Sequence, residues 1–249
     1  MLKLAQERDI DNIINFCNDL IGTRIACYCL AYGFDKDFFT VWIDDEGGVI
    51  NAIVAKFYDS CTVKLTAGYE FDELSQFISM VGCNSIMCSN NLGFSDYDLK
   101  KAYVFLGELS DFSSRHLGEE YYKQLYSLIS EAIPGSFDNS KEAYLAWLSD
   151  FTYRQRRNLA RSKGVVQNGE LLSCVITSSE SHKAAVLSGV ACKPTARKSG
   201  LGKATVLSVV NELANEGKKA YVIALNESAE GFYEHIGFEY IHDIYLIKI

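Results

Sequence analysis

The segment Arg197–Gly202 reads R-K-S-G-L-G, and it constrains the fold of this chain more than any other feature. An apolar run at 184–192 precedes it, and helix-forming residues follow it at 203–214. This order predicts a buried strand, a tight turn and the N-terminus of a helix. Such a junction is typical of a site that binds a phosphate group.

Glycine and basic residues suit this turn to an anion. Gly200 and Gly202 lack a Cβ, so the backbone can adopt turn dihedrals and bring several free N–H groups close to one ligand. The helix dipole adds attraction for negative charge. Positive charge comes from Arg197, Lys198 and Lys203. We therefore predict a pyrophosphate-binding turn, with a surface helix that merely begins at a glycine as the alternative.

Two common nucleotide loops do not fit the spacing. A P-loop ending at Gly202 would need glycine in place of Arg197 and Ser or Thr in place of Ala204. A dinucleotide fingerprint starting at Gly200 would need a small residue in place of Thr205. The segment is therefore not predicted to bind a nucleotide in either of these ways.

A second motif follows the first helix. The run K-A-Y-V-I-A-L at 219–225 predicts a buried strand, and the residues at 227–235 predict a helix. Gly237-Phe238 then leads into another strand. Asn226 and Tyr233 lie seven residues apart, close to two helical turns, so both side chains can face one cleft.

Together, R-x-x-G-x-G and N-x-x-A-x-x-F-Y-x-x-x-G-F, in this order on strand, helix, strand and helix, resemble the GNAT superfamily of acyl-CoA-dependent N-acyltransferases. Both motifs lie within residues 184–240, and the resemblance extends less specifically over 111–183. It implies a mixed α+β and α/β fold, in which helices flank a central mixed sheet in the C-terminal part. It also implies acetyl-CoA, or a longer acyl-CoA, as co-substrate and an amine as acceptor, with no metal.

The resemblance assigns roles to individual residues. Tyr233 would stand beside the sulfur of the coenzyme as the catalytic acid. The strand before the turn would pair with the pantetheine arm, and Asn226 would bond its amide region. The residues implied to bind the coenzyme are Val190, Ala191, Cys192, Arg197, Lys198, Ser199, Gly200, Leu201, Gly202, Lys203 and Asn226.

The implied reaction is direct attack of an amine on the thioester carbonyl. A backbone N–H within 190–192 would stabilise the oxyanion, and Tyr233 would protonate the leaving thiolate, since a phenol has a pKa near 10. A packing role under the sheet is the alternative for this tyrosine. Cys192 could instead carry the acyl group in a two-step route, although a core thiol is the simpler interpretation.

The sequence does not single out a general base. Some family members place a glutamate on the strand before the loop, but 183–193 contains no carboxylate. Glu170, Asp111, Glu119 and His182 are open alternatives, beside a relay through water.

Whole-chain properties fit a water-soluble enzyme. The 249 residues are 48% hydrophobic with a mean hydropathy of −0.01, and no apolar run approaches the length of a membrane span. The first residues, M-L-K-L-A-Q-E-R-D, lack the apolar core of a signal peptide, so we expect a cytoplasmic protein that does not bind membranes. The eight cysteines include no C-x-x-C pair, which favours buried reduced thiols over zinc.

Charge is unevenly distributed along the chain. Residues 1–105 carry a net charge of −7 and residues 106–249 a net charge of −1, which argues against a nucleic-acid partner. A basic stretch at 154–163 is predicted to be a solvated segment beside a strand. The less favoured alternative is that it meets coenzyme phosphates or an acidic substrate.

The first half is predicted to be a separate α+β domain, residues 1–98, that lacks a coenzyme loop. Its only candidate loop, T-A-G-Y-E at 66–70, has one glycine and no flanking base, although the half could be a degenerate copy of an acyltransferase lobe. A polar stretch at 89–101 marks the boundary with the GNAT-like domain, residues 99–249. The elements expected in the first half are a helix at 9–20 capped by Asp9, strands at 23–32, 38–43, 49–57, 61–67 and 85–88, and a helix at 72–80.

The second half is predicted to follow the element order of the family. The expected elements are a strand at 103–106, helices at 118–131 and 141–148, a hairpin of 163–167 and 171–177 closed at Asn168-Gly169, and final strands at 239–241 and 244–249. A non-catalytic acyl-CoA-binding or regulatory protein stays open as the alternative function, as does a purely structural role. The sequence also leaves open the identity of the acceptor, the acyl length and the oligomeric state, with a homodimer as one option.

Overall fold

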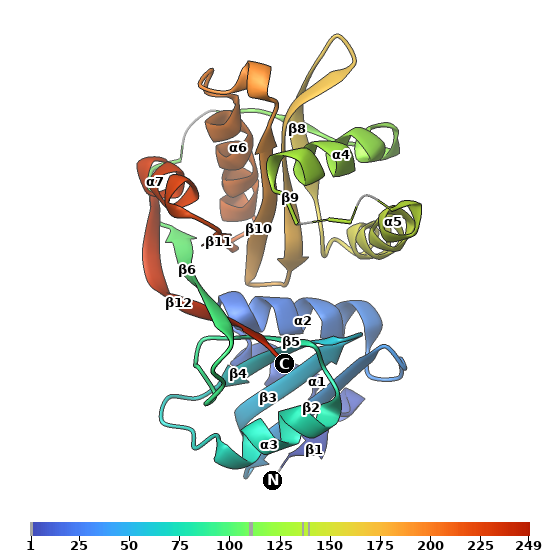
Figure 1. Ribbon diagram of the computed structural model, residues 1–249, viewed down its shortest axis with the longest axis vertical. Helices are drawn as coiled ribbons and strands as arrows, with labels where there is room; N and C mark the ends of the chain where they lie inside the picture. Colours follow the sequence, from blue (N-terminus) through green and yellow to red (C-terminus); the bar gives the residue numbers. More distant parts are fainter. Residues whose placement is uncertain (1, 110–111, 136, 139) are drawn as a thin grey trace. The chain divides into compact units, whose positions relative to one another are not determined.

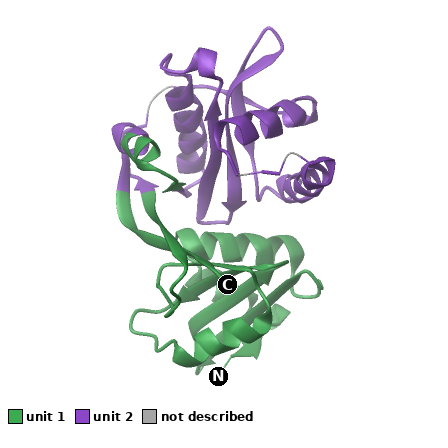
Figure 2. Cartoon of the chain, in the orientation of Figure 1, with its two compact units in different colours: residues 1–103, 223–231, 240–249 green, residues 104–222, 232–239 purple. Residues whose placement is uncertain are grey.

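The structure is a computed structural model that describes residues 2–109, 112–135, 137–138 and 140–249. The chain forms two compact units, coloured separately in Figure 2. Unit 1 comprises residues 1–103, 223–231 and 240–249, and unit 2 comprises residues 104–222 and 232–239. Neither unit is one continuous stretch of chain, and the boundary at 98–99 stays a prediction about the sequence domains.

Unit 1 combines helices with a sheet whose strand order is β1-β2-β3-β4-β5-β12 (Figure 1). The pair β4–β5 is parallel, and the pairs β1–β2, β2–β3, β3–β4 and β5–β12 are antiparallel. Its elements are β1 (Lys3–Leu4), α1 (Ile10–Phe16), α2 (Leu20–Tyr32), β2 (Phe39–Glu46), β3 (Val49–Phe57), β4 (Ser60–Leu65), α3 (Asp72–Val81), β5 (Ser85–Cys88) and most of β6 (Tyr97–Phe105) and β12 (Phe238–Lys248).

The sheet of unit 1 is covered on both faces. Ile53 and Val54 are adjacent on β3 and both fully buried, and neighbouring side chains of a strand point to opposite faces. Val54 lies in a core cluster with Leu74 and Ile78, so α3 covers its face. The apolar residues of the sequence predicted this core because they recur at strand and helix spacing.

The segment 23–32 is a helix and not the strand predicted from the sequence. It belongs to α2, whose N-terminus is capped by Asp19 with an Oδ1 that accepts from Gly22 N at 2.7 Å. Ten of the thirteen residues of α2 are buried, so the run is apolar on every side and carries no helical period. A short run of this kind reads equally as a buried strand.

Other predictions for unit 1 hold with small changes. The helix near the N-terminus is confirmed as α1, but it ends at Phe16 and not at residue 20, and the side chain of Asp9 does not cap it. The carboxylate of Asp9 accepts from Gln6 N at 2.9 Å instead. The polar boundary stretch is partly structured, since β6 begins at Tyr97 and not at residue 103.

Unit 2 contains a sheet with the strand order β11-β10-β9-β8-β7. The pair β10–β11 is parallel, and the pairs β10–β9, β9–β8 and β8–β7 are antiparallel. The elements are β7 (Arg115–His116), α4 (Tyr122–Ala132), α5 (Lys141–Gln155), β8 (Ser162–Gln167), β9 (Glu170–Glu180), β10 (Ala184–Cys192), α6 (Leu201–Asn215), most of β11 (Lys219–Ala224) and part of α7 (Glu227–His235).

Helices cover the two faces of this sheet. Ser173 on β9 bonds Thr205 of α6 through their hydroxyl groups at 2.9 Å, whereas Cys174, the next residue, lies in a core cluster with Leu125 and Ile129 of α4. Because consecutive strand residues point to opposite faces, α6 and α4 lie on opposite sides (Figure 1). The mixed α+β fold predicted from the sequence is thus confirmed.

Several local predictions for the second half can be compared with this unit. Asn168 and Gly169 both have positive φ, 51° and 80°, as a two-residue type I′ hairpin turn requires. The predicted bounds of β10 and α7 are confirmed. In contrast, α5 is seven residues longer than predicted, and the two expected final strands are the one strand β12.

Gly237 has a structural reason to be glycine. Its φ is +103°, and its carbonyl accepts from Leu106 N and Gly107 N, both at 3.0 Å. A Cβ on Gly107 would lie 2.8 Å from Gly237 Cα. The G-F step of the second motif therefore marks a place where two backbones touch.

Two features that the sequence does not predict, a membrane-spanning helix and a metal site, can be compared with the described residues. None of the helices in this part of the chain is both long and apolar enough to cross a membrane. Among the same residues, no group of three His, Cys, Asp or Glu side chains is arranged to hold a metal ion. The eight cysteines are free thiols, seven of them buried.

Candidate functional site

Strand β10 parts from β11 halfway along its length. The two strands pair in parallel from Ala184 with Lys219 to Leu187 with Val222. β10 then continues through 188–192, and in the part of the chain that the structure describes these five residues have no partner on β11. Backbone groups on this side of β10 are therefore not used by the β11 ladder.

A bulge lies where the two strands part. Ser188 pairs with Ile176 and Ala191 with Cys174, so β10 carries one residue more than β9 over this interval. Gly189 has a φ of +55°, and a Cβ there would lie 2.6 Å from Ile129 Cδ1. A bulge redirects the side chains and peptide groups beside it, here those of Val190.

The loop that follows β10 is held by its own backbone and side chains. A short 3-10 turn, Pro194–Ala196, leads into two residues with positive φ, Lys198 at 61° and Gly200 at 83°. Ser199 Oγ donates to Ala196 O at 2.6 Å. The left-handed conformation of Gly200 is the turn geometry predicted from the sequence.

The N-terminus of α6 is uncapped. Gly200 occupies the N-cap position and offers no side chain, and the first helical bond runs from Ala204 N to Gly200 O at 3.0 Å. Within the described residues, no carbonyl accepts from the backbone N–H groups of 199–203. Free N–H groups at a helix start, together with the helix dipole, form an anion site.

The cations of the turn are not neutralised by carboxylates. Arg197 and Lys198 are exposed, Lys203 is half-buried, and none of the three forms an ion pair among the described residues. Arg197 Nε donates to Cys192 O at 3.4 Å, which leaves the other guanidinium donors unused by this bond. The turn therefore combines free donors with positive charge.

Gly202 differs from the prediction made for it. It lies in the first turn of α6 and does not have a positive φ. A Cβ on Gly202 would meet only Phe232 Cζ at 3.8 Å, an ordinary contact. The turn dihedrals therefore require glycine at 200 and not at 202.

Tyr233 is buried in unit 2, with 7% of its surface exposed. Its ring contacts Phe232 and Phe238 with centroids 5.3 and 5.5 Å away. Burial raises the pKa of its phenol, so the hydroxyl keeps its proton at neutral pH. Asn226 belongs to unit 1, where its Oδ1 accepts from Ala229 N at 3.0 Å and caps α7.

The candidate bases are mostly engaged elsewhere. Glu170 pairs with Lys193, and Glu119 pairs with Arg156 at 3.7 Å. Both glutamates and Arg156 are exposed, and Lys193 is partly buried. His182 is exposed in the turn between β9 and β10. Asp111 lies outside the described residues.

The same succession of elements in unit 1 has these features only in part. The N-terminus of α3 also lacks a side-chain cap, but β4 extends only two residues, Lys64 and Leu65, beyond its pairing with β5. β5 pairs with β4 along its whole length, from Ser85 to Cys88. The loop after β4 contains Gly68 with a φ of +76°, but Tyr69 OH donates to Asp44 Oδ2 at 2.7 Å. Three carboxylates and no basic residue occupy 66–73.

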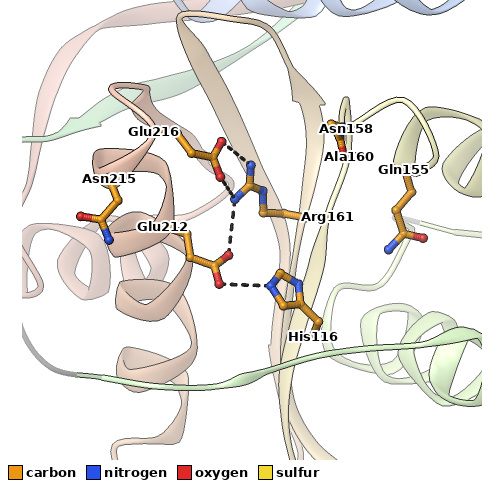
Figure 3. A pocket seen from close by; sticks show the side chains of 8 residues that line it. All are labelled: His116, Gln155, Asn158, Ala160, Arg161, Glu212, Asn215 and Glu216. Carbon is orange, nitrogen blue, oxygen red and sulfur yellow. Dashed lines mark hydrogen bonds and ion pairs between the residues drawn. The ribbon is translucent and has the colours of Figure 1, made fainter.

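A polar pocket of about 700 Å³ lies at the other end of α6, in unit 2 (Figure 3). Arg161, which immediately precedes β8, points toward Glu212 and Glu216. His116 Nε2 lies 3.1 Å from Glu212 Oε1. The pocket is lined by His116, Gln155, Asn158, Ala160, Arg161, Glu212, Asn215 and Glu216. None of these is a binding or catalytic residue predicted from the sequence.

This network corrects the prediction of a solvated basic stretch at 154–163 for three of its five basic residues, whereas Arg156 and Arg157 are exposed as predicted. Arg154 and Lys163 are buried, and Arg161 bonds the fully buried Glu180 at 2.7 Å. Lys163 Nζ lies 2.5 Å from Glu212 Oε1. These three side chains pair with carboxylates inside unit 2, because a buried cation is stable only with a partner.

Comparisons with known proteins agree with this fold. Residues 163–247 match the model of the FR47-like protein family. No curated protein matches the chain.

Solved structures match across the whole chain. A GNAT-family acetyltransferase from Colwellia psychrerythraea is 12% identical, with a TM-score of 0.60, 100% of this chain covered and 99% of that one. A tandem GNAT protein from the clavulanic acid biosynthesis pathway is 10% identical, with a TM-score of 0.63 and coverages of 100% and 98%. A GCN5-related N-acetyltransferase from Sphaerobacter thermophilus is 12% identical, with a TM-score of 0.61 and coverages of 99% and 94%. The chain thus has the GNAT acetyltransferase fold, with an additional N-terminal lobe that fits the tandem GNAT arrangement.

Proposed function

We propose that this protein is an N-acyltransferase that moves an acetyl group from acetyl-CoA to an amine. One observation carries the proposal: β10 parts from β11 and leads directly into a basic turn at an uncapped helix N-terminus. A strand with an unused edge can bind an extended amide chain, and the turn can bind a pyrophosphate. The coenzyme contains these two groups in this order.

The proposed contacts follow the chain. Val190, Ala191 and Cys192 bond the pantetheine arm through their backbone. The N–H groups of 198–203 hold the pyrophosphate, aided by the charges of Arg197, Lys198 and Lys203. Each charge-assisted hydrogen bond contributes about 1.5 to 3 kcal/mol. Asn226 bonds the pantetheine through its amide NH₂, since its Oδ1 already caps α7.

The proposed chemistry is direct transfer. The amine attacks the thioester carbonyl, and an N–H group within 190–192 stabilises the oxyanion. Tyr233 protonates the leaving thiolate, because a phenol holds its proton at neutral pH and can donate it as the thiolate forms. A two-step route through Cys192 is not favoured, because burial raises the pKa of this thiol and lowers its thiolate fraction.

The two lobes divide the work in this proposal. The domain at 99–249 carries the reaction, and the domain at 1–98 does not bind coenzyme because its equivalent loop is acidic. The free thiols fit a reducing compartment such as the cytoplasm.

The test is release of free coenzyme A from acetyl-CoA across a panel of amines, with Tyr233→Phe beside the wild type. We expect the variant to lose about 10²- to 10⁴-fold in turnover and to keep its coenzyme affinity, because the ring still packs against Phe232 and Phe238. Tyr126→Phe is the control, since this buried tyrosine bonds Asp138 O through its hydroxyl and belongs to the α4 side.

Two results would count against the proposal. Equal turnover in Tyr233→Phe and wild type would remove this residue from the chemistry. Saturable binding of acetyl-CoA without transfer to any amine would favour the non-catalytic binding protein.

A further inference from the structure

The polar pocket at the far end of α6 takes no part in the proposed reaction. It lies within unit 2, and its volume of about 700 Å³ falls in the range of small-molecule sites, about 300 to 1,000 Å³. None of the residues that line it is proposed to bind the coenzyme. Seven of the eight lining residues are polar, with Ala160 as the exception. A molecule that fits this pocket is therefore polar on all sides.

The charges around the pocket cancel one another. Three cations and three carboxylates form one network of ion pairs: Arg161, Lys163, Lys218, Glu180, Glu212 and Glu216. His116, which also lines the pocket, adds a positive charge only when it is protonated. The network therefore has no surplus of either sign with which to bind an ionic ligand.

The cations of this network have no donors left for an anion. The guanidinium of Arg161 makes five hydrogen bonds to the carboxylates, at 2.7 to 3.4 Å, and so uses its five N–H donors. Lys163 Nζ is buried between Glu212 and Ser208. A ligand carboxylate or phosphate would have to break these pairs, and breaking a buried ion pair is strongly unfavourable.

Amide groups supply the donors that the cations do not. Tyr122 OH donates to Gln155 Oε1, which orients this amide and leaves its NH₂ group to the pocket. Figure 3 shows the Gln155 nitrogen on the side of His116. Asn158 and Asn215 also line the pocket, and in the described part of the chain no group accepts from the NH₂ of these three amides.

The carboxylates keep some capacity as acceptors. Among the described residues, Glu216 Oε1 and Glu212 Oε2 each accept from Arg161 alone, so each oxygen retains a lone pair. A hydroxyl group donates one hydrogen bond and accepts up to two. It can therefore join an amide NH₂ to a carboxylate oxygen, whereas an ammonium group donates without accepting and a carboxylate accepts without donating.

We propose that this pocket binds a neutral polyhydroxylated molecule of monosaccharide size. Its hydroxyl groups accept from the NH₂ groups of Gln155 and Asn215 and donate to the free lone pairs of Glu212 and Glu216. The charge balance excludes the ionic forms of such a molecule, because nothing in the network compensates the loss of their hydration. This site is separate from the proposed transfer reaction and does not depend on it.

The experiment titrates the ¹⁵N-labelled full-length protein with glucose, galactose and mannose and follows the side-chain NH₂ signals by NMR. The signals are assigned by their loss in Gln155→Met and Asn215→Ala. With at least one sugar we expect saturable shifts of both signals at concentrations up to about 0.1 M. The uronate and the amino sugar that correspond to the bound sugar should need higher concentrations for half-saturation. Saturating coenzyme A should leave the shifts unchanged.

Asn215→Ala removes one exposed amide, and we expect the remaining shifts to report an affinity about 5-fold weaker, since one neutral hydrogen bond is lost. Gln167→Ala is the matched control, because this exposed amide lies at the opposite end of β8. The absence of a saturable shift with all three sugars would overturn the proposal, as would tighter binding of a charged counterpart. An unchanged affinity in Asn215→Ala would overturn the contact with that amide.

None of these measurements uses acyl transfer, so failure of this proposal is distinct from failure of the proposed function. Displacement of the sugar by coenzyme A would overturn the separation of the two sites. It would place the sugar with the coenzyme instead of at the far end of α6.

Discussion

The segments β10–loop–α6 and β4–loop–α3 occupy the same place in two similar successions of elements. In each unit two helices precede three antiparallel strands, a helix and a strand parallel to the third. The segment in unit 2 has a strand pair that parts over five residues of β10, three cations, and a glycine at the N-cap of its helix. The segment in unit 1 has a β5 that is paired with β4 along its whole length and three carboxylates. Its Tyr69 donates a hydrogen bond to Asp44 of β2.

This difference indicates that the fold alone would not create the proposed binding site. Both loops contain a glycine with positive φ before a helix, although Gly200 is the N-cap residue of α6 and Gly68 lies four residues before α3. The charge around the turn is not shared, and the unpaired end of the strand before it is five residues long on β10 but two on β4. Function in such a fold resides in those local features, and each can be changed separately by substitution.

The largest effect is expected when a carboxylate is placed in each turn. Gly200→Asp should lower the affinity for coenzyme A at least about 100-fold, because its charge repels the pyrophosphate and at least two charge-assisted bonds are lost. Gly68→Asp is the matched control. Both glycines have positive φ, and a Cβ at either position would meet nothing within 4 Å.

Thermal shift and titration calorimetry with coenzyme A measure this comparison, since a ligand that binds only the folded state raises its stability. Similar backbone strain is expected in both variants, so a difference between them reports the ligand. Equal loss of affinity in both would show that the two loops are not functionally distinct.

A smaller effect is expected when only the charges are removed. The triple variant Arg197→Ala, Lys198→Ala, Lys203→Ala should bind coenzyme A about 10-fold to 30-fold more weakly at low salt, and the difference should shrink at high salt. The backbone donors of the turn remain in this variant. Binding unchanged at every ionic strength would assign the site to the backbone alone.

The reverse change sharpens the same point. The variant Glu70→Lys, Asp72→Lys, Glu73→Lys gives the loop of unit 1 a positive charge. We expect it to gain no second coenzyme site in titration calorimetry, because β4 extends only two residues beyond its pairing with β5, whereas β10 extends five beyond its pairing with β11. A second saturable site would show that charge is sufficient.

The sequence predicts a feature well when the residues that determine it lie within one short segment. The strand, turn and helix around Gly200 were predictable because an apolar run, a glycine and a helix start follow each other within one short segment. The sequence did not reveal the repeated succession of elements, because α2 is buried on nearly every side and reads as a strand. With 23–32 assigned as helix, both halves would have shown two helices before three strands.

Other features depend on contacts that no single segment contains. The parting of β10 from β11 is a relation between two strands, and the bulge at Gly189 depends on a contact with Ile129 of α4. The basic stretch was misread for the same reason, because the partners of Arg161 lie 19 to 55 residues away in the sequence. A pattern in one segment cannot report such partners.

The smallest expected effect concerns the far ends of the two helices. At the end of α6, Glu216 Oε1 lies 2.8 Å from an Arg161 nitrogen, and Glu216 Oε2 lies 2.8 Å from Lys218 Nζ. The end of α3 has instead the bond from Lys56 to a backbone carbonyl. The bond from Arg161, with a contribution from Lys218, lowers the pKa of Glu216 to about 2.

A carboxyl group with a folded-state pKa below its unfolded value stabilises the fold above the unfolded pKa, about 4.3, and this contribution is lost as pH falls toward 2. The side chain of Glu216 is 42% exposed, so solvent screens the pair and its contribution is below about 1 kcal/mol. Glu216→Gln should therefore lower the free energy of unfolding slightly at pH 7, and the deficit should shrink between pH 5 and pH 3 in urea titrations. Glu131→Gln, at an exposed position in the last turn of α4, should change little at any pH. A deficit for Glu216→Gln that grows as the pH falls would contradict the pairing at the end of α6 and leave the two helices distinguished by their N-termini alone.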